Sequence, residues 1–165
     1  MECDDMNSMI HLALHLDEID PAGFVYTASK YHFNGDGVHT LGEVTPHYSC
    51  SGKLAYSGHI GYPHPDPEAV SLKAYRPFEE GWIESLWQNE YAAVYPNLLK
   101  HSPDYPSPEY LLSITKTGNI AFEGDVREET EGSEFIARTV LDDDERTLYL
   151  LSWGGMNTIV RALMS

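Results

Sequence analysis

Two adjacent carboxylates near the start of the chain, Asp4 and Asp5, are the residues best placed to do chemistry. They precede an amphipathic stretch that predicts a helix, so they lie where a strand would lead into a helix. In open parallel sheets, ligands bind beyond the carboxyl ends of the strands, beside such helix N-termini. Two carboxylates there suit a hard cation such as calcium, or the vicinal hydroxyls of a sugar. The alternative needs no ligand, because Asp4 can cap the helix while Asp5 stabilises its dipole.

The histidines are a second group of candidate ligands. His11 and His15 have the four-residue spacing of a zinc pair on a helix, but they project away from its apolar face and lack the usual glutamate. We interpret them as part of a solvated outer face. Five more histidines cluster in one long loop without metal-ligand spacing, and we expect them to line a polar pocket: His32, His39, His47, His59 and His64.

The composition limits the class of protein. The chain has 165 residues, 26 acidic and 10 basic, and a formal net charge of −16. Phosphate backbones are bound through lysine and arginine, which are scattered singly here, so the charge excludes nucleic acid polymers and disfavours anionic membrane surfaces. No apolar run is as long as a membrane span, and the acidic N-terminus does not resemble a signal peptide. We expect free thiols at Cys3 and Cys50, and a solvated turn at the acidic run 142–145.

The elements that must position the candidate carboxylates begin with a helix over residues 4–16. A buried strand is predicted over 22–28, where β-formers follow an Asp-Pro pair. Residues 29–77 carry turn signals and little periodic structure, which is typical of a functional insertion. The apolar residues of the first helix share one face at helical spacing: Met6, Met9, Ile10, Ala13 and Leu14, widened by Leu12 and Leu16.

The remainder of the chain predicts more helices and one further strand. In chain order we expect helices over 78–94 and 107–112, a helix from Thr130, a strand over 147–153, and a helix from Met156 after the Gly154-Gly155 turn. Helices that alternate with strands are typical of an α/β fold with a parallel sheet.

Several strings then follow one another along the chain: ECDDMNS at 2–8, GFVYTASKYH at 23–32, YPNL at 95–98, YPSPEYL at 105–111, TEGS at 130–133 and WGGMNTI at 153–159. In this order they resemble the bacterial cellulose-binding proteins that have a nucleoside-hydrolase-like N-terminal domain. The resemblance covers nearly the whole chain. It implies an α/β, three-layer, doubly wound and mostly parallel sheet, of which residues 1–165 form a partial nucleoside-hydrolase-like domain.

The resemblance also implies a site. True nucleoside hydrolases hold calcium through the fingerprint Asp-x-Asp-x-x-x-Asp-Asp, and Asp4 and Asp5 match its last two positions. By this resemblance Asp4 hydrogen-bonds a ribose diol, Asp5 is a bidentate calcium ligand, and the backbone carbonyl of Asn157 is another ligand. A calcium-bound water then attacks the anomeric carbon. The general base corresponds to a position before Met1, so the catalytic residues are unknown, and Lys30 stands where nucleoside hydrolases have a substrate-binding asparagine.

Two functions of the parent protein follow from the resemblance. One is hydrolysis of an N-glycosidic, ribosyl-type bond of a nucleoside-like molecule. The other is non-catalytic binding of cellulose or another plant polysaccharide. The family's first strand and the C-terminal half of its domain have no counterpart in these residues, so we expect the chain alone to be inactive. Unpaired strand edges predict marginal folding or self-association. The sequence assigns neither a compartment nor an oligomeric state.

Overall fold

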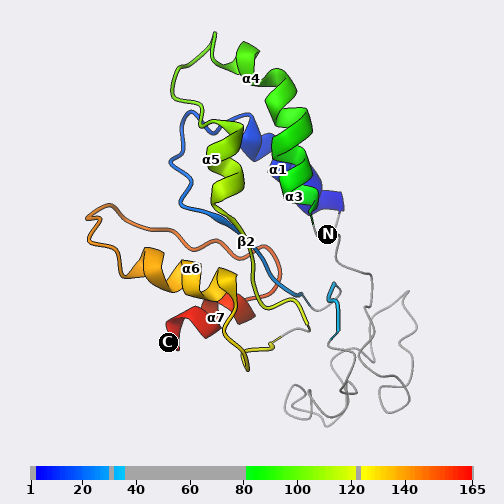
Figure 1. Cartoon of the computed structure of the whole chain (residues 1–165), viewed down its shortest axis with the longest axis vertical. Coiled ribbons are helices and arrows are strands. Elements are labelled where there is room, and N and C mark those ends of the chain that lie inside the picture. Colours follow the sequence, from blue (N-terminus) through cyan, green and yellow to red (C-terminus); the bar gives the residue numbers. More distant parts are fainter. Residues whose placement is uncertain (1–2, 30–31, 36–80, 122–123, 165) are drawn as a thin grey trace.

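The computed structural model describes residues 3–29, 32–35, 81–121 and 124–164 (Figure 1). No helix in these ranges is long and apolar enough to cross a membrane. Helices and parallel strands alternate along the chain, as expected for the predicted α/β class. The elements in chain order are α1 (Cys3–Ala13), β1 (Phe24–Tyr26), α3 (Trp82–Ser85), the π-helical η1 (Leu86–Tyr91), α4 (Ala92–Leu98), α5 (Pro108–Ser113), β2 (Thr115–Thr117), α6 (Glu131–Val140) and α7 (Asn157–Leu163).

Helix α1 carries the two candidate carboxylates in its first turn. Its buried side consists of Met9 and Ala13, and Leu16 continues this stripe in the turn after the helix. The prediction that Ile10 and Leu14 share the buried face is wrong, because their side chains are 43% and 48% exposed. The helix ends at Ala13, so the helical spacing no longer determines the direction of Leu14. Ile10 lies beside the narrow buried stripe that Met9, Ala13 and Leu16 form, and not in it.

Strands β1 and β2 form a two-stranded parallel sheet in which Phe24 lies opposite Thr115. The pairing extends past the assigned strands, since the N–H of Ala28 donates to the carbonyl oxygen of Asn119 at 2.9 Å. The strand predicted over 22–28 is thus confirmed, although its assigned part is shorter. The sequence does not predict β2, because Thr-Lys-Thr offers no apolar alternation.

The apolar core lies against one face of β1, where the continuous helix formed by α3, η1 and α4 covers it. Trp87 is completely buried, and the centroid of its ring lies 5.1 Å from that of Phe24. Its Nε1 donates to Oγ1 of Thr115 at 3.1 Å, which fixes η1 against β2. The helix predicted over 78–94 is confirmed where the structure describes it, residues 78–80 lying outside the described ranges.

The shorter helices begin at the capping residues that the sequence predicts. The Oγ of Ser107 accepts the N–H of Tyr110 at 3.2 Å, which starts α5. Thr130 starts α6 through a capping box, in which its Oγ1 accepts the N–H of Ser133 at 3.1 Å and its own N–H donates to the Ser133 hydroxyl at 2.9 Å. Such caps satisfy backbone donors that a helix leaves unpaired at its N-terminus.

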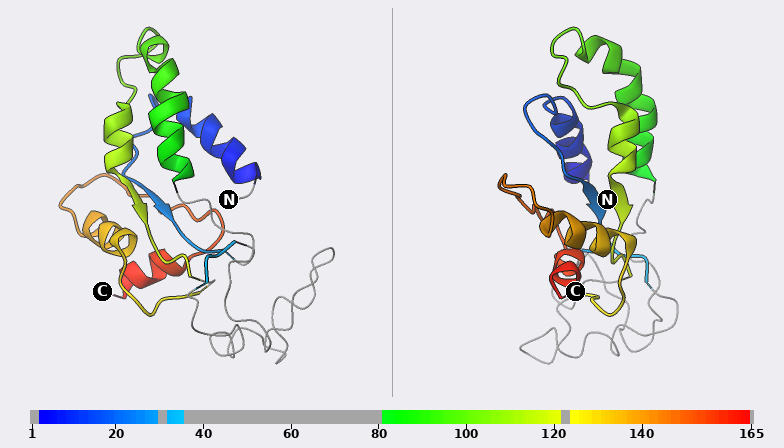
Figure 2. Two further views of the ribbon diagram at one scale, coloured as in Figure 1. Left: turned by 45° about the vertical axis from the view of Figure 1, so that its right-hand side comes forward. Right: turned by 60° about the vertical axis from the view of Figure 1, so that its left-hand side comes forward.

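The two faces of β1 contact different sets of helices, because successive side chains of a strand point to opposite sides. Phe24 and Tyr26 belong to the core formed with α1, α3 and η1. Val25 and Thr27 face the other way, toward Gly132 of α6 and Thr158 of α7. Figures 1 and 2 show α6 and α7 side by side below the strands, with the remaining helices above. Helices therefore cover the sheet on both faces.

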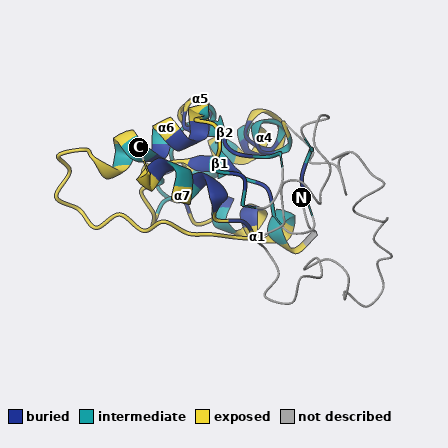
Figure 3. Ribbon diagram, turned by 90° about the horizontal axis from the view of Figure 1, so that it is seen from below, coloured by how far each residue is buried: buried dark blue, intermediate teal, exposed yellow. Residues whose placement is uncertain are grey.

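The prediction of a strand over residues 147–153 is wrong. The segment is extended but pairs with neither described strand, and all residues over 141–154 are exposed (Figure 3). Its sequence favours an extended conformation, yet a strand needs a neighbour to satisfy its backbone groups. The Gly154-Gly155 turn and the helix that follows it are as predicted, with α7 beginning at Asn157.

Candidate functional site

The carboxyl ends of β1 and β2 meet the N-termini of several helices at one edge of the sheet. Figure 2 shows the first turn of α1 on the same side of the molecule as these strand ends. Hydrogen bonds described below bring the starts of α3, α6 and α7 to it. We call this region the carboxyl edge, and it comprises residues 27–29 and 118–120 with the first turns of these four helices.

At the centre of the carboxyl edge, two threonines and two asparagines form a closed ring of hydrogen bonds. The N–H of Asn119 donates to Oγ1 of Thr158 at 2.8 Å, and that hydroxyl donates to Oγ1 of Thr27 at 3.0 Å. Thr27 donates in turn to Oδ1 of Asn157 at 3.0 Å, and Nδ2 of Asn157 donates back to the carbonyl oxygen of Asn119. We call this closed set of Thr27, Asn119, Asn157 and Thr158 the Asn157 ring.

The side chain of Asn119 links the Asn157 ring to helix α6. Its Nδ2 donates to the carbonyl oxygen of Glu128 at 2.9 Å, and its Oδ1 accepts the hydroxyl of Thr130, the α6 cap, at 3.2 Å. Asn119, Asn157 and Thr158 are each at most 3% exposed. Because buried polar groups bonded to one another are held in one arrangement, the ring positions the helices at the carboxyl edge.

Two glycines allow α7 to approach the strands this closely. A Cβ on Gly155 would lie 1.6 Å from the carbonyl oxygen of Ala28, so no side chain fits there. A Cβ on Gly118 would lie 2.5 Å from Oγ1 of Thr158. The backbones therefore come within reach of the Asn157 ring only because both positions lack a side chain.

On the opposite face of β1, Tyr26 connects the carboxyl edge to the start of α3. Its hydroxyl accepts the N–H of Ile83 at 2.6 Å and donates to Oε2 of Glu84 at 2.7 Å. Burial raises the pKa of Tyr26 far above its usual range, and the hydrogen bond to Glu84 raises it further. Tyr26 therefore stays a neutral donor at ordinary pH and orients the Glu84 carboxylate.

The predicted site residues occupy different parts of this edge. Asp4 is exposed and Asp5 is half-buried in the first turn of α1, whereas the side chain of Asn157 belongs to the ring at the start of α7. In Figures 1 and 2 the starts of α1 and α7 lie apart. In the part of the chain that the structure describes, no three His, Cys, Asp or Glu side chains gather as a metal site. The calcium assignments of Asp5 and Asn157 stay a prediction.

The histidines divide between described and undescribed residues. His11 is exposed on α1 and His15 is exposed in the turn that follows it, so both are solvated as predicted, although only His11 belongs to the outer face of the helix. His39, His47, His59 and His64, and also Lys30, lie outside the described residues. The predicted polar pocket therefore stays a prediction.

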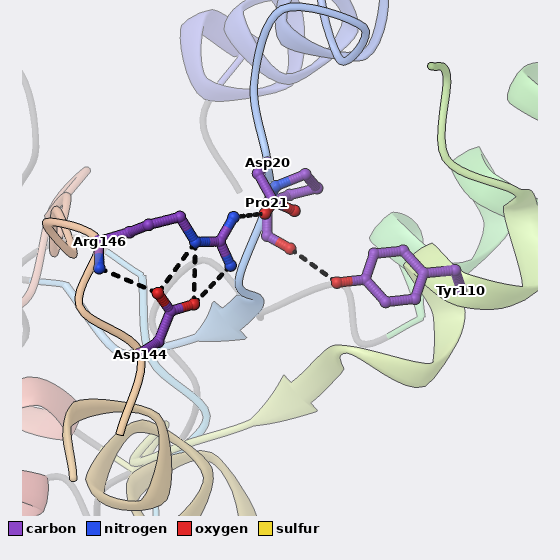
Figure 4. Close-up of polar contacts among 5 residues, drawn as sticks. All are labelled: Asp20, Pro21, Tyr110, Asp144 and Arg146. Carbon is purple, nitrogen blue, oxygen red and sulfur yellow. Dashed lines mark hydrogen bonds and ion pairs between the residues drawn. The ribbon is translucent and has the colours of Figure 1, made fainter. Parts of the chain in front are cut away.

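At the end of β1 away from the carboxyl edge, Arg146 joins two distant segments (Figure 4). Its Nε contacts both carboxylate oxygens of Asp144, at 3.0 and 2.9 Å, and its Nη1 contacts Asp20. Beside them, the hydroxyl of Tyr110 donates to the carbonyl oxygen of Pro21 at 3.1 Å. The Arg146 guanidinium lowers the pKa of Asp144 to about 2. The acidic run is exposed, as predicted, but it is tied to the loop before β1.

Sequence reasoning missed Thr27, Asn119 and Thr158, although it singled out Asn157. Their signal is weak, because small polar residues after a strand or at a helix start are common in any turn. Gly118 and the Gly-Gly pair before Asn157 mark the places in the sequence where α7 approaches the strands closely.

Comparison with known proteins gives a consistent result. The family model described as "Cellulose-binding Sde182, nucleoside hydrolase-like domain" matches residues 1–165. Among solved structures, a nucleoside hydrolase-related hypothetical protein from Saccharophagus degradans, described as associated with carbohydrate metabolism, is similar with a TM-score of 0.57 and 24% identity. The match covers 93% of this chain and 28% of that one, and at this identity it shows a shared fold. No curated protein matches the chain.

Proposed function

Because the chain belongs to the family of the nucleoside hydrolase-like domain of cellulose-binding Sde182, we propose that it binds a plant polysaccharide at the carboxyl edge. The observation that carries this proposal is the exposed carboxylate of Asp4, in the first turn of α1, on the side of the molecule where the strands end (Figure 2). An ionised carboxylate accepts hydrogen bonds through both oxygens, which suits the vicinal hydroxyls of a sugar.

The electrostatics of the chain support a neutral ligand. A formal net charge of −16 repels phosphates and anionic surfaces, whereas a neutral polysaccharide meets no such repulsion. The Asn157 ring supports the same proposal, since it makes the base of the carboxyl edge rigid without using Asp4. A rigid edge loses little conformational entropy when a ligand binds.

The arrangement of the layers supports a doubly wound parent fold. Val25 and Thr27 contact α6 and α7, while Phe24 and Tyr26 contact the helices on the other face. We infer that the two described strands belong to the three-layer, mostly parallel sheet that the family resemblance implies. In such sheets the carboxyl edge is the ligand-binding edge.

A depletion assay on insoluble cellulose tests the polysaccharide proposal. The chain is mixed with microcrystalline cellulose, and the protein left in the supernatant is measured for the wild type, Asp4→Asn and Asp143→Asn. Asp143 is the matched control, because it is an exposed carboxylate in the 142–145 turn. A hydrogen bond to a charged group contributes about 1.5–3 kcal/mol, so Asp4→Asn is expected to weaken binding about 10-fold or more. Equal depletion by all three proteins, or none by the wild type, contradicts the proposal.

A second candidate function is cleavage of a glycosidic bond by the intact parent protein, and half-buried Asp5 beside Asp4 favours it. The described residues alone do not fit a calcium ion, because no third carboxylate or histidine joins Asp5. A site using Asp5 and the Asn157 carbonyl therefore needs ligands from outside the described residues, and we assign no reaction step to calcium.

The test of this second function uses p-nitrophenyl riboside with calcium. The expected result is release of p-nitrophenol by the intact parent protein and a loss of release in its Asp5→Asn variant. Release that survives the substitution contradicts a role for Asp5. Cellulose binding without any release leaves the polysaccharide proposal as the function of the family member.

A further inference from the structure

The carboxylate of Glu84 is a fixed hydrogen-bond acceptor at the carboxyl edge, on a different helix from Asp4. Glu84 is half-buried in the continuous helix that α3, η1 and α4 form. Its Oε2 accepts the hydroxyl of Tyr26 at 2.7 Å. Within the described ranges no second donor and no lysine or arginine contacts this carboxylate, so its other oxygen, Oε1, stays open to a ligand or to water.

The buried hydroxyl of Tyr26 fixes the direction of this carboxylate. The hydroxyl oxygen accepts the N–H of Ile83 at 2.6 Å, and its single proton is directed to Glu84. Tyr26 is only 3% exposed, so it does not turn toward solvent. A side chain that is already held in one conformation loses little rotamer entropy when a ligand bonds to it.

Tyr26 also places this carboxylate where the strands end. It is the last residue of β1, so its hydrogen bond to Glu84 lies at the carboxyl end of the strand. Helices α1 and α3 pack in one core on the same face of β1, and Figures 1 and 2 show both of them beginning on the side where the strands end. Asp4 and Glu84 therefore belong to the same edge but come from different helices.

We propose that Glu84 binds a hydroxyl group of the polysaccharide through Oε1, and that Tyr26 is the positioning residue of this carboxylate. The inference rests on the proposed function, because it assigns a second anchor for the sugar chain at the same edge. An ionised carboxylate is a strong acceptor for sugar hydroxyls. Two anionic anchors repel a uronic acid, so the ligand class is a neutral polysaccharide.

The test is an NMR titration with cellohexaose that gives a Kd for each variant. Glu84→Gln keeps the size and shape of the side chain but removes its charge, and the Kd is expected to rise about 10-fold. Glu90→Gln is the matched control, because it makes the same substitution at an exposed position of the same continuous helix. Its Kd is expected to equal that of the wild type.

The positioning role of Tyr26 has a test of its own. Tyr26→Phe removes the hydroxyl that holds Glu84, and the Kd is expected to rise about 3-fold or more, because the carboxylate then loses rotamer freedom on binding. In a Glu84→Ala background the same substitution is expected to cause no further rise. A purely structural effect of Tyr26 would weaken binding equally in both backgrounds, and that result overturns the positioning role.

The variants separate this inference from the proposed function. If the wild type does not bind cellohexaose, or if Asp4→Asn binds as tightly as the wild type, the polysaccharide proposal fails and the role of Glu84 fails with it. If Asp4→Asn weakens binding while Glu84→Gln and Glu90→Gln both match the wild type, only the Glu84 inference is overturned. A lower urea midpoint in Glu84→Gln with an unchanged Kd also overturns it, because Glu84 then only stabilises the helix dipole.

Discussion

Replacing Asn157 by alanine tests whether the Asn157 ring holds the carboxyl edge together. The side chain is 3% exposed, accepts the hydroxyl of Thr27 at 3.0 Å and donates to the carbonyl oxygen of Asn119. Its removal leaves the hydroxyl donor of Thr27 unsatisfied, which costs about 1–3 kcal/mol, and loses the second hydrogen bond, to the Asn119 carbonyl, which contributes about 0.5–1.5 kcal/mol; that carbonyl keeps the N–H of Ala28. We expect the free energy of unfolding to fall by about 3 kcal/mol in total.

Urea unfolding followed by tryptophan fluorescence measures this loss. With a slope of about 2 kcal/mol per molar urea, the midpoint falls by about 1.5 M. Asn97→Ala is the matched control, because Asn97 is exposed on α4 and accepts only an exposed lysine, Lys100, at 2.9 Å. The free energy of unfolding of Asn97→Ala is expected to stay within about 0.5 kcal/mol of the wild type. An Asn157→Ala midpoint equal to that of Asn97→Ala refutes the reasoning.

A double-mutant cycle with Thr27→Val examines the ring itself. Both residues bond to each other, so their effects on the free energy of unfolding are expected to couple by about 0.5 kcal/mol or more. Simple addition of the two single effects would show that the hydrogen bonds act separately and do not form one cooperative unit.

Three further perturbations follow from local geometry. Gly155→Ala places a Cβ 1.6 Å from a backbone carbonyl oxygen and is expected to destabilise the protein strongly. Gly81→Ala is the control, because its Cβ meets open space and only the positive φ costs about 1–2 kcal/mol. Equal unfolding midpoints for the two variants contradict this. Burial raises the pKa of Tyr26, so the folded protein holds this proton more tightly than the unfolded chain does. The resulting contribution to stability is complete below about pH 10 and is lost as the pH rises further. Tyr26→Phe is therefore expected to flatten the alkaline decline in stability, and an unchanged pH profile contradicts this. Arg146→Gln is expected to raise the pKa of Asp144 from about 2 toward 3.8, as measured by carboxyl NMR titration. In the wild type the ion pair contributes stability that is lost as the pH falls from 3.8 through about 2, and the variant is expected to lack this acid-dependent loss. An unchanged titration of Asp144 contradicts the pairing.

The helices could be predicted because their start signals are local. Ser107 and Thr130 satisfy N–H groups within their own first turns, and Gly154-Gly155 ends one segment and permits the next. The strands depend on neighbours instead. Residues 147–153 have the composition of a strand yet pair with no described strand, whereas the polar β2 pairs because α5 and Trp87 hold it against β1. Propensity alone does not distinguish these cases.

The candidate site was predictable only in part. Asp4 and Asp5 lie at the start of a helix on the predicted edge, since the order of strand and helix fixes that placement. The Asn157 ring was not predictable, because Thr27 and Thr158 meet only after α7 returns to β1 from the far end of the chain. Such contacts are set by tertiary packing, and no local pattern announces them.

The central claim is that the carboxyl edge binds a polysaccharide, and an NMR titration of the labelled chain with cellohexaose tests it directly. We predict shift changes at the amides of the first turn of α1, around Asp4 and Asp5, and at residues 27–29 of the same edge. Asp4→Asn is expected to weaken the titration, while Asp143→Asn leaves it unchanged. Shift changes confined to the exposed segment 147–153, or none at any residue, would contradict the account.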